Sequence, residues 1–167
     1  LLPADVRVMD VNVVSPDFHA RFDAVSKEYR YFIFQGPVLP PEIRRIRHHV
    51  RKELDVEKMC RAATLLQGEK DFLSFSANRG KPEESTVRTI MECRFTGGAP
   101  EYCFTVKADG FLYKMVRQLA GALLRVGRGE MSLPEFQKLL DQPVRNHLAP
   151  TAPPQALFLW EVLYPEM

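Results

Sequence analysis

Tyrosine and arginine alternate at one point of the chain, in an arrangement suited to binding nucleic-acid bases. Tyr29, Arg30 and Tyr31 lie in a segment typical of a β-strand, which would turn both tyrosines to one face of a sheet and Arg30 to the other. RNA-binding proteins use aromatic rings beside cations in this way, because every base has a face on which a ring can stack. The tyrosines could equally pack the sheet, and both interpretations remain open here.

A dense basic run over residues 44–52, RRIRHHVRK, is the second candidate site. Such a run can hold a phosphate backbone by charge. It could also form an ordinary solvated surface, balanced by the acidic residues that follow it. The cations that would contact RNA are Arg44, Arg45, Arg47, Arg51 and Lys52.

Residues 111–128 carry the strongest helical periodicity in the sequence. Leu112 begins an apolar stripe, and the opposite side bears Lys114, Arg117 and Gly121. Lysine and arginine are common on the wet side of a helix, so the cations alone do not establish a site. A glycine inside a helix costs roughly 1 kcal/mol relative to alanine. Gly121 therefore predicts the close approach of a ligand or of another backbone segment.

The motifs of several common enzyme classes are missing from the sequence. It contains no GxxxxGK[ST], GxGxxG or GxSxG pattern, so phosphate-binding loops and nucleophile elbows have no support. The three cysteines include no CxxC pair, and the adjacent His48 and His49 have poor spacing for metal ligands. These motifs therefore suggest no phosphate-binding loop, nucleophile elbow or zinc site.

Composition indicates one globular domain covering residues 1–167. Of the residues, 46% are apolar and 26% are charged, a mix that argues against disorder, and the net charge is only +2. No apolar run approaches the ~18 residues that a membrane-spanning helix needs.

The elements that would position these side chains can be predicted from periodicity and from turn residues. We expect helices over residues 56–67 and 111–128, and a short helix capped by Ser132. A polar loop, expected to be mobile, covers residues 78–85. The expected strands are 6–14, 28–34, a hairpin of 86–96 with 101–107, and a final buried strand at 157–164. The fold predicted is α+β, with a mixed, mainly antiparallel sheet and helices packed on one face.

Five segments in this order resemble the tRNA pseudouridine synthase A family. They are DFHARFDAVSKEYRYFIF (17–34), GEKDFLSF (68–75), TVRTI (86–90), ADGFLYKMVRQLAGALLRVGRG (108–129) and PTAPPQALFLWEVLYP (150–165). The resemblance extends from about residue 2 to residue 165, and its most specific parts are FHAR followed by YRY, and FLYKMVR. It implies the C-terminal half of an enzyme that isomerises uridine to pseudouridine in the anticodon arm of tRNA, without any cofactor.

The resemblance also implies a role for particular residues. Tyr29 would stack on the flipped uracil and assist proton removal at C5, while Arg117 would pair with a catalytic aspartate. Phe111 and Leu112 would form the apolar wall of the uracil pocket, and Arg21 of FHAR would lie near the RNA. The basic run and Lys114 would contact the tRNA backbone. Tyr113, Lys114 and Gln118 differ from the residues common in the family, which should alter RNA contacts more than chemistry.

In this family the catalytic aspartate lies in an N-terminal half, on a segment Gly-Arg-Thr-Asp-Ala-Gly that these 167 residues lack. We therefore expect this chain alone to be inactive. The resemblance further implies a cytoplasmic protein that is a homodimer at full length. Two alternatives remain: a non-catalytic RNA-binding module related to the family, and a generic α+β interaction domain without RNA affinity.

Overall fold

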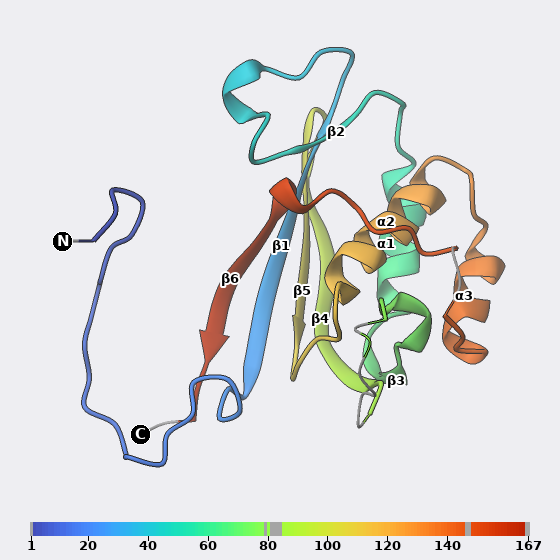
Figure 1. Ribbon diagram of the computed structural model, residues 1–167. Helices are drawn as coiled ribbons and strands as arrows, with labels where there is room; N and C mark the ends of the chain where they lie inside the picture. Colours follow the sequence, from blue (N-terminus) through green and yellow to red (C-terminus); the bar gives the residue numbers. More distant parts are fainter. Residues whose placement is uncertain (1, 79, 81–84, 146–147, 166–167) are drawn as a thin grey trace.

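The computed structural model describes residues 2–78, 80, 85–145 and 148–165, which form a mixed β-sheet covered by helices (Figure 1). The sheet has six strands in the order β2-β1-β5-β4-β3, with β6 also paired to β1. The predicted α+β class is confirmed. The strands are β1 (Ser26–Gln35), β2 (His48–Val50), β3 (Gly68–Asp71), β4 (Val87–Gly98), β5 (Glu101–Ala108) and β6 (Leu157–Leu163).

Strand β1 is the centre of this arrangement because three strands pair with it. Strand β5 runs antiparallel along one edge, from Lys27 to Phe34. The other edge holds two strands in succession: β6 is antiparallel over residues 26–31, and β2 is parallel over residues 33–35. The segment that leads into β6 therefore meets β1 close to the start of β2.

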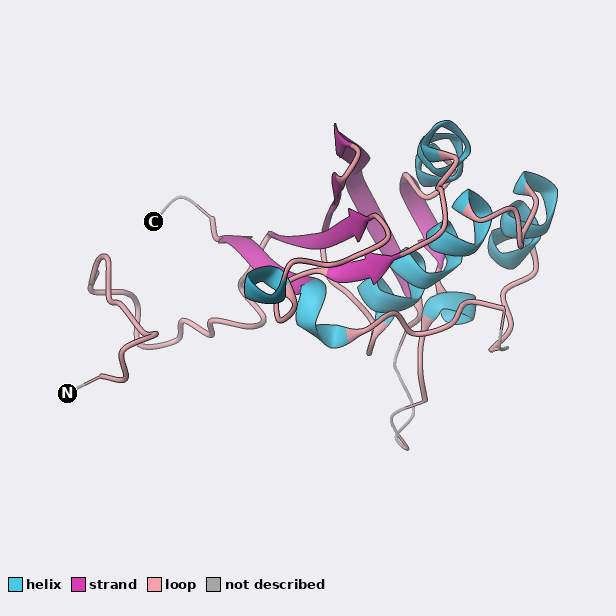
Figure 2. Cartoon of the chain, turned by 90° about the horizontal axis from the view of Figure 1, so that it is seen from above, coloured by secondary structure: helices cyan, strands magenta, loops and turns pink. Residues whose placement is uncertain are grey.

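The α-helices of the described residues lie on one side of the sheet (Figures 1 and 2). They are α1 (Val56–Thr64), α2 (Met115–Gly127) and α3 (Leu133–Asp141). Their apolar sides and the facing side of the sheet enclose the core, because burial removes these side chains from water. The large, fully buried side chains of this core include Tyr31, Phe72, Phe75, Phe104, Leu119, Leu123 and Phe136.

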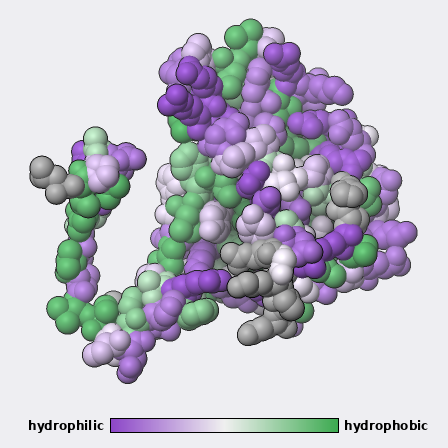
Figure 3. All heavy atoms as spheres, in the orientation of Figure 1, coloured by the Kyte–Doolittle hydropathy of each residue, from purple (hydrophilic) through white to green (hydrophobic). Residues whose placement is uncertain are grey.

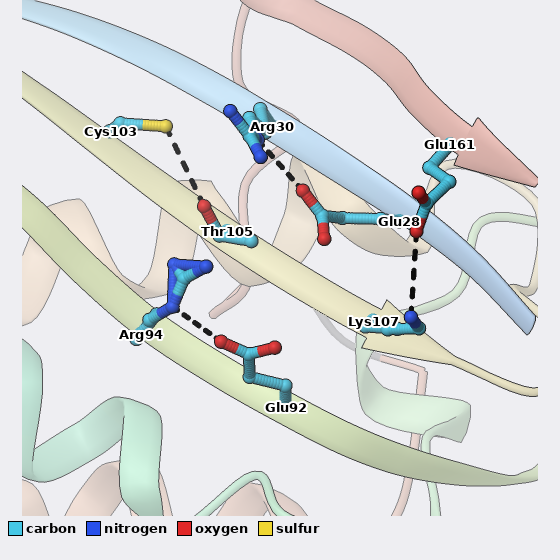
Figure 4. Close-up of polar contacts among 8 residues, drawn as sticks. All are labelled: Glu28, Arg30, Glu92, Arg94, Cys103, Thr105, Lys107 and Glu161. Atoms are coloured by element: carbon cyan, nitrogen blue, oxygen red, sulfur yellow. Dashed lines mark hydrogen bonds and ion pairs between the residues drawn. The ribbon is translucent and has the colours of Figure 1, made fainter.

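The opposite face of the sheet carries paired charges (Figure 4), and it also carries aromatic rings. Glu28 binds Arg30 at 2.7 Å, Lys107 reaches Glu161 at 3.5 Å, and Arg94 pairs with Glu92. Arg30 thus points away from the helices, as predicted from the alternation of side chains along a strand. Its guanidinium lies over Trp160, 3.9 Å from the centre of the ring.

Local signals placed the helices well, with one displaced start. Asp55 caps α1, accepting a hydrogen bond from the Lys58 amide, and Ser132 with Glu135 forms a capping box on α3. Helix α2 begins at Met115 rather than at residue 111. Lys114 has a φ of 60°, a left-handed conformation that no helix can pass through, so residues 111–114 form a turn ahead of it.

The predicted strand over residues 6–14 is wrong. The segment is extended but pairs with no strand in the described residues, and Met9, Val11 and Val13 are almost wholly exposed. Figure 3 shows apolar side chains along this arm, which projects from the body of the molecule. Alternating apolar residues do not make a strand unless a neighbouring strand supplies the hydrogen bonds.

Two further expectations need correction. Strand β6 has the predicted position but is not buried: Leu159 and Trp160 are each 53% exposed. It lies at an edge of the sheet, and within the part of the chain that the structure describes it pairs with β1 alone. The short strands β2 and β3 were not predicted, and β2 lies inside the basic run. The predicted hairpin is confirmed as β4 and β5. The predicted loop 78–85 lies largely outside the described residues.

Candidate active site

Tyr29 and Phe111 meet on the helix side of the sheet. Tyr29 is the fourth residue of β1, and its ring contacts Phe111 edge to face, with the ring centres 5.1 Å apart. Both side chains are half-buried, while Leu112 is only 5% exposed. Burial raises the pKa of the Tyr29 hydroxyl, so it keeps its proton at neutral pH. The pair forms an aromatic corner whose rings are only partly covered.

Arg117 lies in the first turn of α2, where two hydrogen bonds tie it to a segment 35 residues away. Its Nε donates to the Ala152 carbonyl at 2.6 Å, and the Ala152 amide donates to the Arg117 carbonyl at 3.0 Å. Among the described residues, no hydrogen bond or ion pair involves its two terminal nitrogens. These nitrogens form the fork that binds a carboxylate in bidentate fashion. Arg117 is thus held by its inner nitrogen, with its outer edge available.

Tyr31 connects the segment that follows Ala152 to the sheet from within the core. Its hydroxyl donates to the Pro153 carbonyl at 3.0 Å and lies 3.0 Å from Nδ1 of His48. A hydroxyl has one proton, so His48 must donate through Nδ1 to the Tyr31 oxygen. Burial raises the pKa of Tyr31, while the positive charge of Arg117 acts in the opposite direction. Arg117 therefore lies within electrostatic reach of a tyrosine two positions from Tyr29 on the same face of β1.

His48 is held neutral by this environment. Burial is the main cause of a pKa lowered to about 4, and the charges of Arg128 and His49 add to it. Because the neutral ring donates through Nδ1, it fixes Tyr31 in the orientation that reaches Pro153. Sequence reasoning missed both Tyr31 and His48 as supports for the candidate site; the available signal was their position beside Tyr29 and within the basic run.

The other residues expected at the site are more dispersed. Arg21 is exposed on the segment before β1, with its guanidinium 5.5 Å from the centre of the Phe22 ring. In the described part of the chain, no hydrogen bond, ion pair or ring contact joins Arg21 to Tyr29. Lys114 is exposed, with its Nζ 5.2 Å from the centre of the Tyr113 ring.

The basic run follows a turn and then becomes strand β2 at the sheet edge. Arg44, Arg45 and Arg51 are exposed, and Figure 3 shows hydrophilic side chains gathered at the top of the molecule, where this segment lies. Arg47 instead lies over the Phe32 ring and pairs with Glu101 at 3.1 Å, and Lys52 lies 4.0 Å from Glu130. The five cations therefore do not form one patch of equally available charge.

A cavity of about 580 Å³ lies at the far end of α2, between α2 and α3. Its lining includes Arg125, Met131 and Leu139 but none of the side chains predicted for the site. Within the described residues, no helix has the length and apolar character needed to cross a membrane.

Comparison with known proteins identifies the family. A family model described as tRNA pseudouridine synthase matches residues 62–165. The chain is 43% identical over 164 residues to a tRNA pseudouridine synthase A of Methylacidiphilum infernorum, covering 98% of this chain. It belongs to the tRNA pseudouridine synthase family.

Two other relatives in this family support the assignment. A tRNA pseudouridine synthase A 1 of Desulfotalea psychrophila is 38% identical over 170 residues, and a tRNA pseudouridine synthase A of Treponema denticola is 39% identical over 166 residues. These alignments cover 98% and 99% of this chain, respectively. The chain spans only 64%, 68% and 62% of the lengths of the three relatives. The tRNA pseudouridine synthases that it matches are thus considerably longer than its 167 residues.

Proposed function

We propose that this chain supplies one wall of the active site of an enzyme that isomerises uridine to pseudouridine in the anticodon arm of tRNA. The observation that carries the proposal is Arg117, anchored through Nε and open at its outer edge, on the same side of the sheet as the Tyr29–Phe111 corner. Such an arginine suits a carboxylate, and a half-covered aromatic corner suits a flat base. Family membership supports both assignments.

The reaction is an isomerisation, and it needs no external reactant. The bond between N1 of uracil and C1′ of the ribose breaks, the base turns, and C5 bonds to C1′. The proton lost from C5 is balanced by the proton gained at N1. A carboxylate must approach the sugar and base, which requires the uridine to leave its stack. We propose that this carboxylate comes from an N-terminal half carrying the Gly-Arg-Thr-Asp-Ala-Gly segment.

In this reaction we assign a role to each of the four site residues. The terminal nitrogens of Arg117 hold the carboxylate ionised and oriented, helped by the positive end of α2. Tyr29 stacks on the extruded uracil, a contact worth about 1–3 kcal/mol. Its hydroxyl lies within the same corner, where the oxygen accepts the C5 proton as the hydroxyl passes its own proton to solvent. Phe111 and Leu112 keep water from this side of the base, which strengthens the attraction between arginine and carboxylate.

The tRNA contacts and the assembly are further parts of the proposal. Exposed cations suited to the phosphate backbone of tRNA are Arg44, Arg45 and Arg51. We also assign RNA contacts to Arg21 and Lys114. Arg47 and Lys52 would make weaker contacts, because each already lies near a carboxylate. We also propose that the complete enzyme, meaning this chain with its Asp-bearing N-terminal half, is a cytoplasmic homodimer. Sedimentation of the complete enzyme at several concentrations would test the dimer.

Tritium release from tRNA labelled at C5 of uridine tests the proposed activity. The 167-residue chain should release no tritium, whereas the complete enzyme should. In the complete enzyme, Arg117→Ala and Tyr29→Ala should reduce turnover far more than they lower the melting temperature. Turnover by the chain alone would contradict the proposal. Salt-dependent tRNA binding with no turnover in either form would favour a non-catalytic RNA-binding module.

A further inference from the structure

Residues 148–153, here called the strap, run beside α2 and are bonded to it at both ends. At the C-terminal end of the helix, Arg125 donates to the Leu148 carbonyl at 2.9 Å. At the N-terminal end, Arg117 and Ala152 exchange the two hydrogen bonds described above. The strap therefore lies antiparallel to α2 over more than two helical turns.

Gly121 is the point where the strap and the helix are closest. A Cβ built on Gly121 would lie 1.8 Å from the Pro150 carbonyl oxygen and 2.9 Å from its carbon. Those neighbours are backbone atoms, which cannot rotate aside as a side chain can. Only glycine permits this approach, which explains the glycine that the sequence placed inside a helix. Any larger residue must push the strap away from α2.

The far end of the strap is fixed to the sheet. The Pro153 carbonyl accepts the Tyr31 hydroxyl at 3.0 Å, and Ala149 and Ala152 are buried. The strap is therefore held by α2, by β1 and by the core, and Ala152 cannot shift independently of these contacts. The Ala152 carbonyl, which accepts the hydrogen bond from Arg117 Nε, is thus fixed in position by its surroundings.

We propose that the strap is the device that aims Arg117, with Gly121 as the positioning residue that sets its distance. A guanidinium is planar, so a fixed Nε–H direction also restricts where the two outer nitrogens point. The hydrogen bond from Arg117 Nε to the Ala152 carbonyl therefore directs the two terminal nitrogens of Arg117 away from the strap. This inference rests on the proposed function, in which that outer edge meets a carboxylate.

A role in packing alone makes a different prediction. If Gly121 serves only to let the strap pack closely against α2, replacing it lowers stability but leaves the turnover of the folded fraction unchanged. If Gly121 sets the distance of the strap, the replacement moves Ala152 and misdirects Arg117 even in molecules that fold. Misplacing a reacting group by about 1 Å can reduce rate about 100-fold. The loss should appear in kcat and not in the KM for tRNA.

The test compares Gly121→Ala with Gly127→Ala in the complete enzyme. Gly127 lies on the same helix, and a Cβ there would meet side-chain atoms of Met59 and Leu54 instead of the strap. Gly121→Ala should reduce kcat about 10- to 100-fold with KM for tRNA nearly unchanged. Gly127→Ala should lower the melting temperature but leave kcat close to that of the parent. Equal kcat effects in the two variants would overturn the inference.

A second readout does not depend on activity. In the 167-residue chain, the Nε–H resonance of Arg117 should exchange slowly with solvent in the parent and in Gly127→Ala, and rapidly in Gly121→Ala. Should Gly121→Ala fail to fold, Pro150→Gly loosens the strap without pressing on α2 and should show a smaller loss of kcat and of Nε–H protection. Unchanged kcat and protection in Pro150→Gly would then overturn the inference.

The two proposals fail in distinguishable ways. An inactive Arg117→Ala beside a fully active Gly121→Ala would overturn the positioning role and leave the proposed function standing. A fully active Arg117→Ala would overturn the proposed function and, with it, the role of the strap in catalysis.

Discussion

Tyr29 and Arg117 reach the same side of the sheet by different routes. Tyr29 is turned there by the alternation of β1, and Arg117 by the first turn of a helix that starts late. Tyr31 lies between these elements, with its hydroxyl bonded to the strap. Arg117 is therefore held by a hydrogen bond to the Ala152 carbonyl, whereas Tyr29 is held by its position on β1 and by the Phe111 ring.

The Tyr29 hydroxyl can be tested apart from its ring. Tyr29→Phe in the complete enzyme keeps the stacking surface and the contact with Phe111, so tRNA affinity should stay within about twofold, whereas Tyr29→Ala should lose the ~1–3 kcal/mol of a base stack. Single-turnover rates and tRNA binding curves measure the two effects. We expect a large rate loss in both variants. A fully active Tyr29→Phe would assign Tyr29 to stacking alone.

His48 should make stability depend on pH. The unfolded chain binds a proton at His48 near pH 6.5, whereas the folded chain does so only near pH 4. The stability linked to this neutral histidine is complete above pH 6.5 and is lost as the pH falls toward 4. The melting temperature should therefore fall across this window more steeply in the parent than in His48→Gln. Parallel melting curves for the two proteins would show that His48 carries no such linkage.

Among the elements, α3 offers the clearest test of local structure. The Ser132 hydroxyl accepts from the Glu135 amide, and the Glu135 carboxylate accepts from the Ser132 amide. Ser132→Ala should lower the free energy of unfolding by about 1 kcal/mol, measured by urea denaturation. Ser132→Thr keeps the hydroxyl and should lose much less. Equal losses would show that the cap contributes little.

What could be predicted from sequence follows the range of the interactions involved. The cap of α3 and the hairpin of β4 and β5 depend on residues close together in the chain, and both were predicted. The start of α2 was not, because its positive φ falls on a lysine, and no glycine marks the position in the sequence. The contact of Arg117 with Ala152 joins residues 35 apart, and its one local signal was Gly121. The roles of Tyr29 and Arg117 came from the family resemblance and remain proposals.

For the molecule as a whole, the extended arm over residues 2–14 is the least integrated part. Val8, Met9, Val11 and Val13 are exposed, and the hydrogen bonds within this arm join near neighbours in sequence. Deleting residues 1–14 should change the free energy of unfolding by no more than about 0.5 kcal/mol. It should also reduce self-association of the isolated chain, because it removes exposed apolar surface.

Urea denaturation and size-exclusion chromatography measure these two effects of the deletion. A clear loss of stability in the shortened chain would show that the arm packs against the body. Unchanged self-association would place the sticky surface elsewhere, for example on the exposed Leu159 and Trp160 of β6.

The shared edge of β1 has a practical consequence for the tail of the chain. Strand β6 pairs with β1 from its first residue, Leu157. The short turn Pro154–Ala156 joins Leu157 to Pro153 at the end of the strap. If proteolysis or a bulky C-terminal fusion separated β6 from β1, the strap would lose its support at this end, and the Ala152 carbonyl that accepts from Arg117 would become mobile. Loss of β6 pairing, far in sequence from Tyr29 and Arg117, would thus lower kcat under conditions in which the rest of the protein is still folded.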